Sequence, residues 1–139
     1  MGVLGNAAGQ VLISQRPAGK ALAGAWEFPG GKLLEGEAPL AALRRELREE
    51  LDIELRLARH LVTYTHGTAD ARLQLYVWRV LVWSGTPRGA EGQTLRWLSA
   101  GELLDAGLLG ADAPIVAALE RPAAVMQLDW ERCWEAMTG

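Results

Sequence analysis

The sequence predicts one mixed α/β domain, because strand-like segments surround a single central helix and further helical segments follow at the end. The chain has 139 residues, of which 50% are hydrophobic, and this is enough apolar surface for the core of one ordinary domain. No internal repeat, low-complexity tract or obvious linker interrupts it. We therefore expect a single domain over residues 1–139.

The first half of the chain predicts a strand, a long loop and the central helix. A turn in GNAAG precedes a strand through Val11–Ile13, and glycine and proline punctuate residues 17–36, which is typical of a long loop. Pro39 suits the first turn of a helix. Within that helix, leucines recur at helical spacing and predict one buried stripe. These leucines are Leu40, Leu43, Leu47 and Leu51.

The second half predicts a β-rich stretch followed by short helices. Strand-like runs rich in β-branched and aromatic residues cover residues 54–65 and 72–83, and a shorter one covers 94–99. Ser99 and Glu102 have the spacing of a capping box, which opens a short helix.

Two more helices are expected near the C-terminus, over residues 113–120 and 123–139. In the last one, Met126, Trp130 and Trp134 repeat every four residues, and core packing is the favoured interpretation of such a stripe. The same stripe could instead mediate dimerisation or lead toward a further domain.

Charge and cysteine content narrow the possible partners. A net charge of −3 provides no overall basic field for a nucleic acid polymer or an anionic membrane. No apolar run approaches the ~20 residues of a membrane span. Cys133 is the single cysteine, so no internal disulfide can form, and a reducing cytoplasm is the simpler expectation.

The segment RRELREEL is the first pointer to chemistry. It places Glu46, Glu49 and Glu50 on one flank of the central helix, although like charges at this spacing repel by a few tenths of a kcal/mol. Converging carboxylates suit Mg²⁺ or Mn²⁺, whose usual partners are substrate phosphates. A solvated helix with arginine ion pairs explains the segment equally well. The upstream PGG turn, where backbone can approach a ligand closely, favours the metal site.

The stretch GKLLEGEAPLAALRRELREELDI resembles the Nudix box, G-x5-E-x7-R-E-U-x-E-E-x-G-U, where U is aliphatic. The match covers residues 31–53. Asp52 stands where the family has glycine, and aspartate tolerates a left-handed backbone better than most residues. The positions in register are Gly31, Glu37, Arg45, Glu46, Leu47, Glu49, Glu50 and Ile53.

This resemblance implies an α/β/α sandwich with a mixed β-sheet and a Mg²⁺-dependent hydrolase, with Mn²⁺ as an alternative metal. It implies that Arg45 anchors Glu37 and the loop and does not contact the substrate. Glu49, Glu50 and Glu91 are the candidates for the general base, and the sequence does not choose among them. The implied metal ligands are the carbonyl of Gly30 and the carboxylates of Glu46, Glu49, Glu50 and Glu91.

The motif WEFPGGK resembles the MutT-like branch of this family, in which water attacks the β-phosphorus of a nucleoside triphosphate and pyrophosphate leaves. That resemblance implies sanitising of 8-oxo-dGTP. It places Arg16 and Lys32 near the phosphates, and Phe28 and Asp112 near the nucleobase. An aromatic residue such as Phe28 is more commonly part of a core.

Asp112 stands where the MutT pattern has asparagine. An ionised carboxylate only accepts hydrogen bonds, so Asp112 suits a base edge rich in N–H groups, such as guanine, or must be protonated; it could also simply cap a helix. There are two alternative hypotheses. The substrate could be a different nucleotide, such as a cytidine triphosphate or a nucleotide sugar, or the domain could be a non-catalytic sensor. We expect a monomer or a weak dimer.

Overall fold

The computed structural model describes residues 1–31, 33–68, 70–108 and 112–119. Lys32 and the helix expected over residues 123–139, with its methionine and tryptophan stripe, lie outside them. The strands are β1 (Gly2–Leu4), β2 (Val11–Gln15), β3 (Trp26–Glu27), β4 (Glu54–Thr68), β5 (Ala71–Ser84) and β6 (Leu95–Leu98). The helices are α1 (Pro39–Leu51), α2 (Ala100–Asp105) and α3 (Ala113–Leu119).

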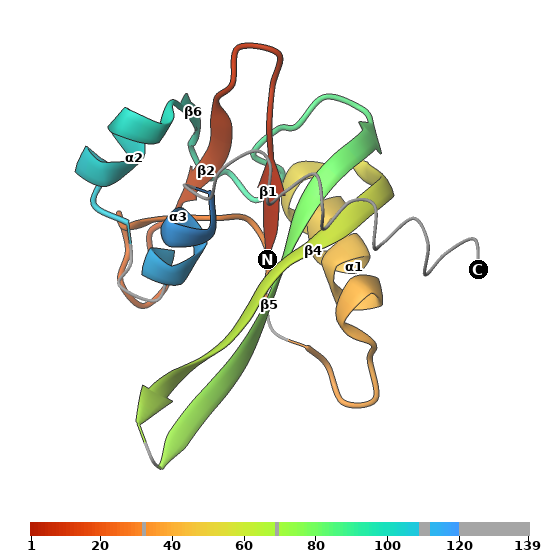
Figure 1. The fold of residues 1–139 in the computed structure, drawn as a ribbon, viewed down its shortest axis with the longest axis vertical. Helices are drawn as coiled ribbons and strands as arrows, with labels where there is room; N and C mark the ends of the chain where they lie inside the picture. The colour runs from red at the N-terminus through yellow and green to blue at the C-terminus, as the bar shows by residue number, and fades with distance from the viewer. Residues whose placement is uncertain (32, 69, 109–111, 120–139) are drawn as a thin grey trace.

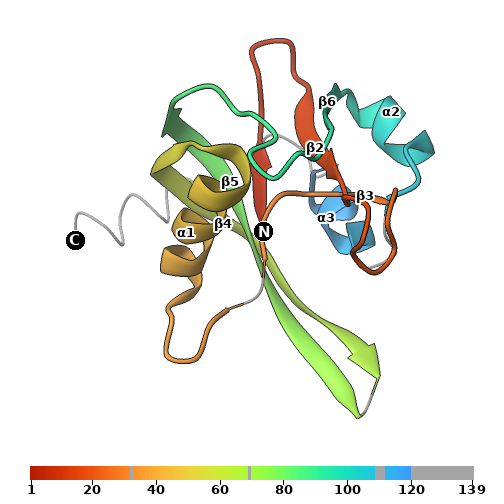
Figure 2. The ribbon, with the colours of Figure 1, turned by 180° about the vertical axis from the view of Figure 1, so that it is seen from behind.

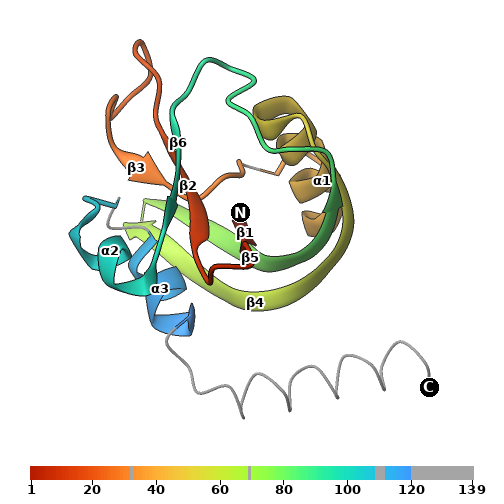
Figure 3. The same ribbon diagram turned by 90° about the horizontal axis from the view of Figure 1, so that it is seen from above.

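The strands form two three-stranded sheets, in the orders β1-β5-β4 and β3-β2-β6. Strand β1 runs parallel to β5, and the other pairs are antiparallel, so the β-structure is mixed as expected. Strands β4 and β5 make a long hairpin whose distal half projects from the body of the molecule (Figure 1 and Figure 2). The hairpin curves around α1 (Figure 3).

Helices α1 and α3 cover opposite faces of the curved hairpin (Figure 3). On the α1 side, Leu43 and Leu47 pack with Leu4 and Val80, whereas on the α3 side Ile115 packs with strand residues of the other core cluster. This is the α/β/α sandwich that the family resemblance implies. It fixes α1, and therefore its glutamates, against the rigid middle of the sheet.

Helix α1 begins at Pro39 and ends at Leu51, so Pro39 stands in the first turn as expected. Asp52 terminates it in the left-handed conformation (φ 55°, ψ 42°), and its backbone N–H donates to the carbonyl of Arg48. This is the geometry that glycine adopts most easily. Asp52 therefore adopts, at the glycine position of the box, the left-handed backbone conformation that glycine would adopt.

Three local predictions need correction. The short strand β1 was missed, because three apolar residues carry too little periodicity to identify a strand, and the expected long loop contains the two-residue strand β3. Leu40, expected in the buried stripe, is 43% exposed. It lies in the first turn of α1, which the described elements leave uncovered, and Ala42 is buried instead. The capping box of Ser99 and Glu102 is confirmed.

None of the helices in the described ranges has both the length and the apolarity needed to cross a membrane.

The apolar face of α1 provides a direct test of the packing. Leu47→Ala removes a fully buried side chain, and we expect it to lower the free energy of unfolding by about 2–5 kcal/mol. Leu40→Ala, on the exposed first turn, should change it by no more than about 0.5 kcal/mol. Urea denaturation of both variants measures this; equal losses would contradict the described orientation of α1.

Candidate active site

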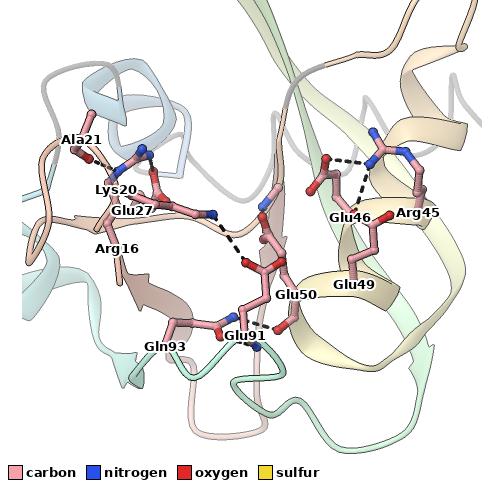
Figure 4. Close-up of polar contacts among 11 residues, drawn as sticks. Arg16, Lys20, Ala21, Glu27, Arg45, Glu46, Glu49, Glu50, Glu91 and Gln93 are labelled. Carbon is pink, nitrogen blue, oxygen red and sulfur yellow. Dashed lines mark hydrogen bonds and ion pairs between the residues drawn. The ribbon is translucent and has the colours of Figure 1, made fainter. Parts of the chain in front are cut away.

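Three segments meet around the acidic flank of α1 (Figure 4). Helix α1 supplies Glu46, Glu49 and Glu50, the turn after β3 supplies Gly30 and Gly31, and the loop between β5 and β6 supplies further polar groups.

The glycine turn lies directly on the carboxylates of α1. The backbone N–H of Gly30 donates to Oε2 of Glu50 at 2.9 Å. A Cβ atom on Gly31 would stand 2.5 Å from the carboxyl carbon of Glu46, so any larger residue would require the Glu46 carboxylate to move. Gly30 also has a φ of 131°, a conformation essentially restricted to glycine. The two glycines thus let backbone approach two carboxylates at once.

Glu46 and Glu50 are close enough for their carboxyl groups to share a hydrogen bond. Burial raises the pKa of Glu50 to about 8, the negative charges of Glu46 and Glu91 act in the same direction, and the Gly30 N–H opposes them. Two partly buried carboxylates in contact repel each other unless a proton or a cation lies between them. This donor set fits a hard divalent cation.

Arg45 holds the acidic flank in place. Its Nε and Nη2 donate to the two oxygens of Glu37 at 2.9 and 3.0 Å, which is the anchoring contact expected from the sequence. Its Nη1 donates to Glu46 at 2.8 Å and to Glu49 at 3.3 Å. Hydrogen bonds to Glu37 and Glu46 raise the pKa of Arg45, and the bond from Arg45 lowers the pKa of Glu37. One guanidinium therefore orients three carboxylates.

Glu49 differs from its two neighbours. Its side chain is 55% exposed and turns toward Arg45. Within the described residues, no three acidic, histidine or cysteine side chains converge as a preformed metal site. In the described residues the expected ligands lie near one another, and Arg45 bonds to Glu46 and Glu49. The metal-binding roles of these residues and of the Gly30 carbonyl stay predictions.

The loop that carries Glu91 is fastened to the end of α1. The carbonyl of Glu50 accepts from the backbone N–H of Ala90 at 3.0 Å and from Nε2 of Gln93 at 2.7 Å. Gln93 Oε1 in turn accepts from the N–H of Glu91. A Cβ on Gly89 would collide with the carbonyl of Gln93. Sequence reasoning missed Gln93, whose only signal was its place two residues after Glu91.

Arg16, expected near the phosphates, begins the loop after β2. Its Nη1 donates to Glu27 at 3.1 Å and its Nε to the carbonyl of Ala21 at 2.7 Å. Glu27 was not predicted from the sequence. The guanidinium is therefore engaged by its own loop and by β3, and its contact with phosphate stays a prediction.

Phe28 and Asp112, the two residues expected near the base, are both fully buried. The Phe28 ring belongs to the core on the α3 side, whereas its backbone N–H donates to Oδ2 of Asp112 at 3.4 Å. Within the described part of the chain, Oδ1 of Asp112 has no hydrogen-bond partner. The side chain of Asp112 accepts a bond from Phe28, the residue that follows β3, and makes no described bond to α3. Capping of α3 therefore does not explain why an aspartate stands here.

Burial raises the pKa of Asp112 to about 7; the Phe28 N–H opposes this, and the charge of Glu27 adds to it. Burial together with the Asp112 charge also raises the pKa of Tyr64 to about 12. A buried carboxyl with an unused oxygen is costly unless something bonds to it. Asp112 is thus a candidate contact for a polar ligand group.

The family model of the NUDIX domain matches residues 1–118 of the chain. The chain belongs to the Nudix family. The Nudix box is the glycine turn together with α1, and the two carboxylates that the turn contacts are box positions.

Among relatives, the CTP pyrophosphohydrolase of Escherichia coli K12 is 39% identical over 110 residues, covering 79% of this chain and 82% of that protein. The 8-oxo-dGTP diphosphatase of the same strain is 34% identical over 121 residues, covering 87% and 94%. Among solved structures, the E. coli ORF135 protein aligns with a TM-score of 0.74 at 37% identity, covering 84% of this chain and 83% of that one. These similarities confirm the Nudix fold.

The role of Arg45 in this Nudix site can be tested by a conservative change. Arg45→Lys keeps the charge but loses the paired bonds to Glu37, so we expect kcat for nucleotide hydrolysis to fall by about 10- to 100-fold. Arg44→Lys is the matched control, because Arg44 contacts Glu54 on the outer side of α1. Similar losses in both variants would show that Arg45 has no special part.

The buried Asp112 predicts a pH dependence of stability. Between its ordinary pKa of 3.8 and about 7, the folded protein binds a proton that the unfolded chain has released. The free energy of unfolding therefore falls as pH rises through this window. Asp112→Asn should flatten that fall by on the order of 1 kcal/mol per pH unit. Urea titrations across the window measure it; parallel curves for variant and wild type would contradict the assignment.

Proposed function

We propose that this protein is a Mg²⁺-dependent pyrophosphohydrolase of nucleoside triphosphates that converts 8-oxo-dGTP to 8-oxo-dGMP and pyrophosphate. The observation that carries the proposal is the contact of the glycine turn with both Glu46 and Glu50, held in place by Arg45. The relative named 8-oxo-dGTP diphosphatase, which aligns over most of both chains, supports the reaction class.

Glu46 and Glu50 would hold the metal ion, with Glu49 and Glu91 as further ligands once they turn toward it. Mg²⁺ is the proposed metal and Mn²⁺ the alternative, because both prefer oxygen ligands. When bound, the ion would neutralise phosphate charge and stabilise the charge that develops as the phosphoanhydride bond breaks.

The positions of the acidic residues suggest which of them acts as the general base. Glu50 and Glu91 line one small pocket together with Ser14 and Glu27, so they face the space where phosphates would lie. One of these two carboxylates would accept the proton of the attacking water. Glu49, on the outer side of Arg45, would have to rotate to serve as that base.

Asp112 is the proposed contact for the nucleobase. Its unpaired Oδ1 can accept from the N–H groups that guanine and its 8-oxo form offer. Burial makes this single bond selective, because a base that leaves Oδ1 unpaired incurs the cost of an unsatisfied buried acceptor.

A cytidine triphosphate is the second candidate substrate. The relative named CTP pyrophosphohydrolase is 39% identical. The exocyclic amino group of cytosine can also donate a hydrogen bond to an ionised Asp112. The expected monomer or weak dimer and the expected cytoplasmic location stay predictions.

A substrate panel decides between these candidates. With Mg²⁺ and equal concentrations of 8-oxo-dGTP, dGTP, dCTP and CTP, we expect kcat/KM for 8-oxo-dGTP to exceed the others by about tenfold or more. Pyrophosphate release measures it. Preference for CTP or dCTP would replace the proposal with the second candidate, and no preference at all would sink the sanitising role.

Glu50→Gln tests the catalytic assignment. The amide keeps the size of the side chain but can neither bind a metal ion as an anion nor accept a proton, so kcat should fall by about 10²- to 10⁴-fold. Glu54→Gln is the control, since Glu54 pairs with Arg44 and Arg48 away from the pocket. Unchanged Mg²⁺-dependent pyrophosphate release by Glu50→Gln would show that the assignment is wrong.

A further inference from the structure

Lys20 reaches across the site from the loop between β2 and β3. Its Nζ lies 3.4 Å from Oε2 of Glu91, which belongs to the loop between β5 and β6 (Figure 4). The two residues are 71 positions apart in the sequence, and no motif in the sequence connects them. The contact is therefore a property of the fold alone.

Acidic side chains predominate in the lining of the small pocket. Three of its lining side chains are carboxylates, from Glu27, Glu50 and Glu91, and among the described residues that line it Lys20 is the only cation. The complete lining is Ser14, Gln15, Pro17, Lys20, Glu27, Glu50, Glu91 and Gln93.

Arg16 lies nearby, but its guanidinium already has hydrogen-bond partners. The guanidinium bonds to Glu27 on β3 and to the carbonyl of Ala21 in its own loop. Its backbone N–H and carbonyl pair with Ala25 and Gly24, which closes the loop at its base. Arg16 thus neutralises Glu27 and shapes the loop, whereas Lys20 lines the pocket and pairs with Glu91 from the opposite loop.

The bond between Lys20 and Glu91 is easily exchanged. The side chains are 55% and 39% exposed, and an exposed ion pair of this kind contributes little to stability. Lysine carries its charge as a compact ammonium on a flexible stem, so it can move to a new anion at little cost.

We propose that Lys20 is a substrate-binding residue, which pairs with Glu91 in the empty site and moves to a phosphate oxygen of the nucleoside triphosphate when the substrate enters. This rests on the proposed function, because it assumes a polyphosphate in the pocket. A divalent cation that binds Glu91 releases Lys20 from it. The released ammonium then faces an incoming polyanion, which it binds by a charge-assisted hydrogen bond.

The exchange predicts two opposite effects of one substitution. Lys20→Ala removes a cation that competes for Glu91, so Mn²⁺ should bind several-fold more tightly in the absence of nucleotide. The same change removes a phosphate contact, so KM for dGTP should rise about tenfold while kcat stays within about twofold. A residue that only stabilises the loop would not separate the two effects in this way.

The experiment uses the full chain in four forms: wild type, Lys20→Ala, Lys20→Arg and Arg56→Ala. Arg56 bonds to Ser84 on the exposed surface of β4, so its variant controls for the loss of one positive charge. Mn²⁺ binding is measured by calorimetry without nucleotide, and KM and kcat are measured for dGTP. We expect Lys20→Arg to recover most of the wild-type KM and Arg56→Ala to match wild type.

Binding of inorganic tripolyphosphate with Mg²⁺, measured by calorimetry, separates this proposal from the proposed function. If no nucleotide is hydrolysed but tripolyphosphate binds about tenfold more weakly to Lys20→Ala, the proposed function fails and the role of Lys20 stands. If tripolyphosphate does not bind to wild type, or binds equally to both proteins, or if Mn²⁺ affinity does not rise in Lys20→Ala, the proposal for Lys20 is overturned.

Discussion

The contact between the glycine turn and the carboxylates of Glu46 and Glu50 is the constraint on which the rest of the site depends. Two acidic side chains lie together beside backbone, where burial, together with the charges of Glu46 and Glu91, raises the pKa of Glu50. That arrangement persists because neighbouring elements determine it. The leucines of α1 fix one side against the sheet, Arg45 holds the outer carboxylates, and Gly30 donates to Glu50.

The loop from β5 to β6 extends the same constraint. It is tied to the last turn of α1 through the carbonyl of Glu50, which accepts from Ala90 and Gln93. Glu91 is thereby held opposite Glu50 although it is forty-one residues away in sequence. Lys20 meets Glu91 from the other side. Three acidic side chains line the small pocket, and Lys20 is the cation among its described lining residues. This arrangement suits a polyphosphate that arrives with a divalent metal ion.

Much of this could be predicted from local sequence, because the box is contiguous. The limits of α1, the left-handed Asp52 and the pairing of Arg45 with Glu37 all depend on residues within one turn and helix. The roles of Gln93 and Lys20 could not be predicted, since they arise where loops distant in sequence come together. Leu40 was misjudged because helical periodicity gives the direction of a side chain and not the extent of the surface that covers it. Asp112 was placed near the base by resemblance, whereas its unpaired oxygen and raised pKa depend on tertiary burial.

The central claim is that Glu46 and Glu50 bind a divalent metal ion at the glycine turn. A crystal structure of the protein with Mn²⁺ and a non-hydrolysable nucleoside triphosphate, recorded with anomalous scattering, tests it most directly. The account predicts an anomalous peak within direct coordination distance of both carboxylates, with the phosphates bound to the same ion. A nucleotide bound with its metal ion away from Glu46 and Glu50, or a peak on Glu49 alone, would contradict it.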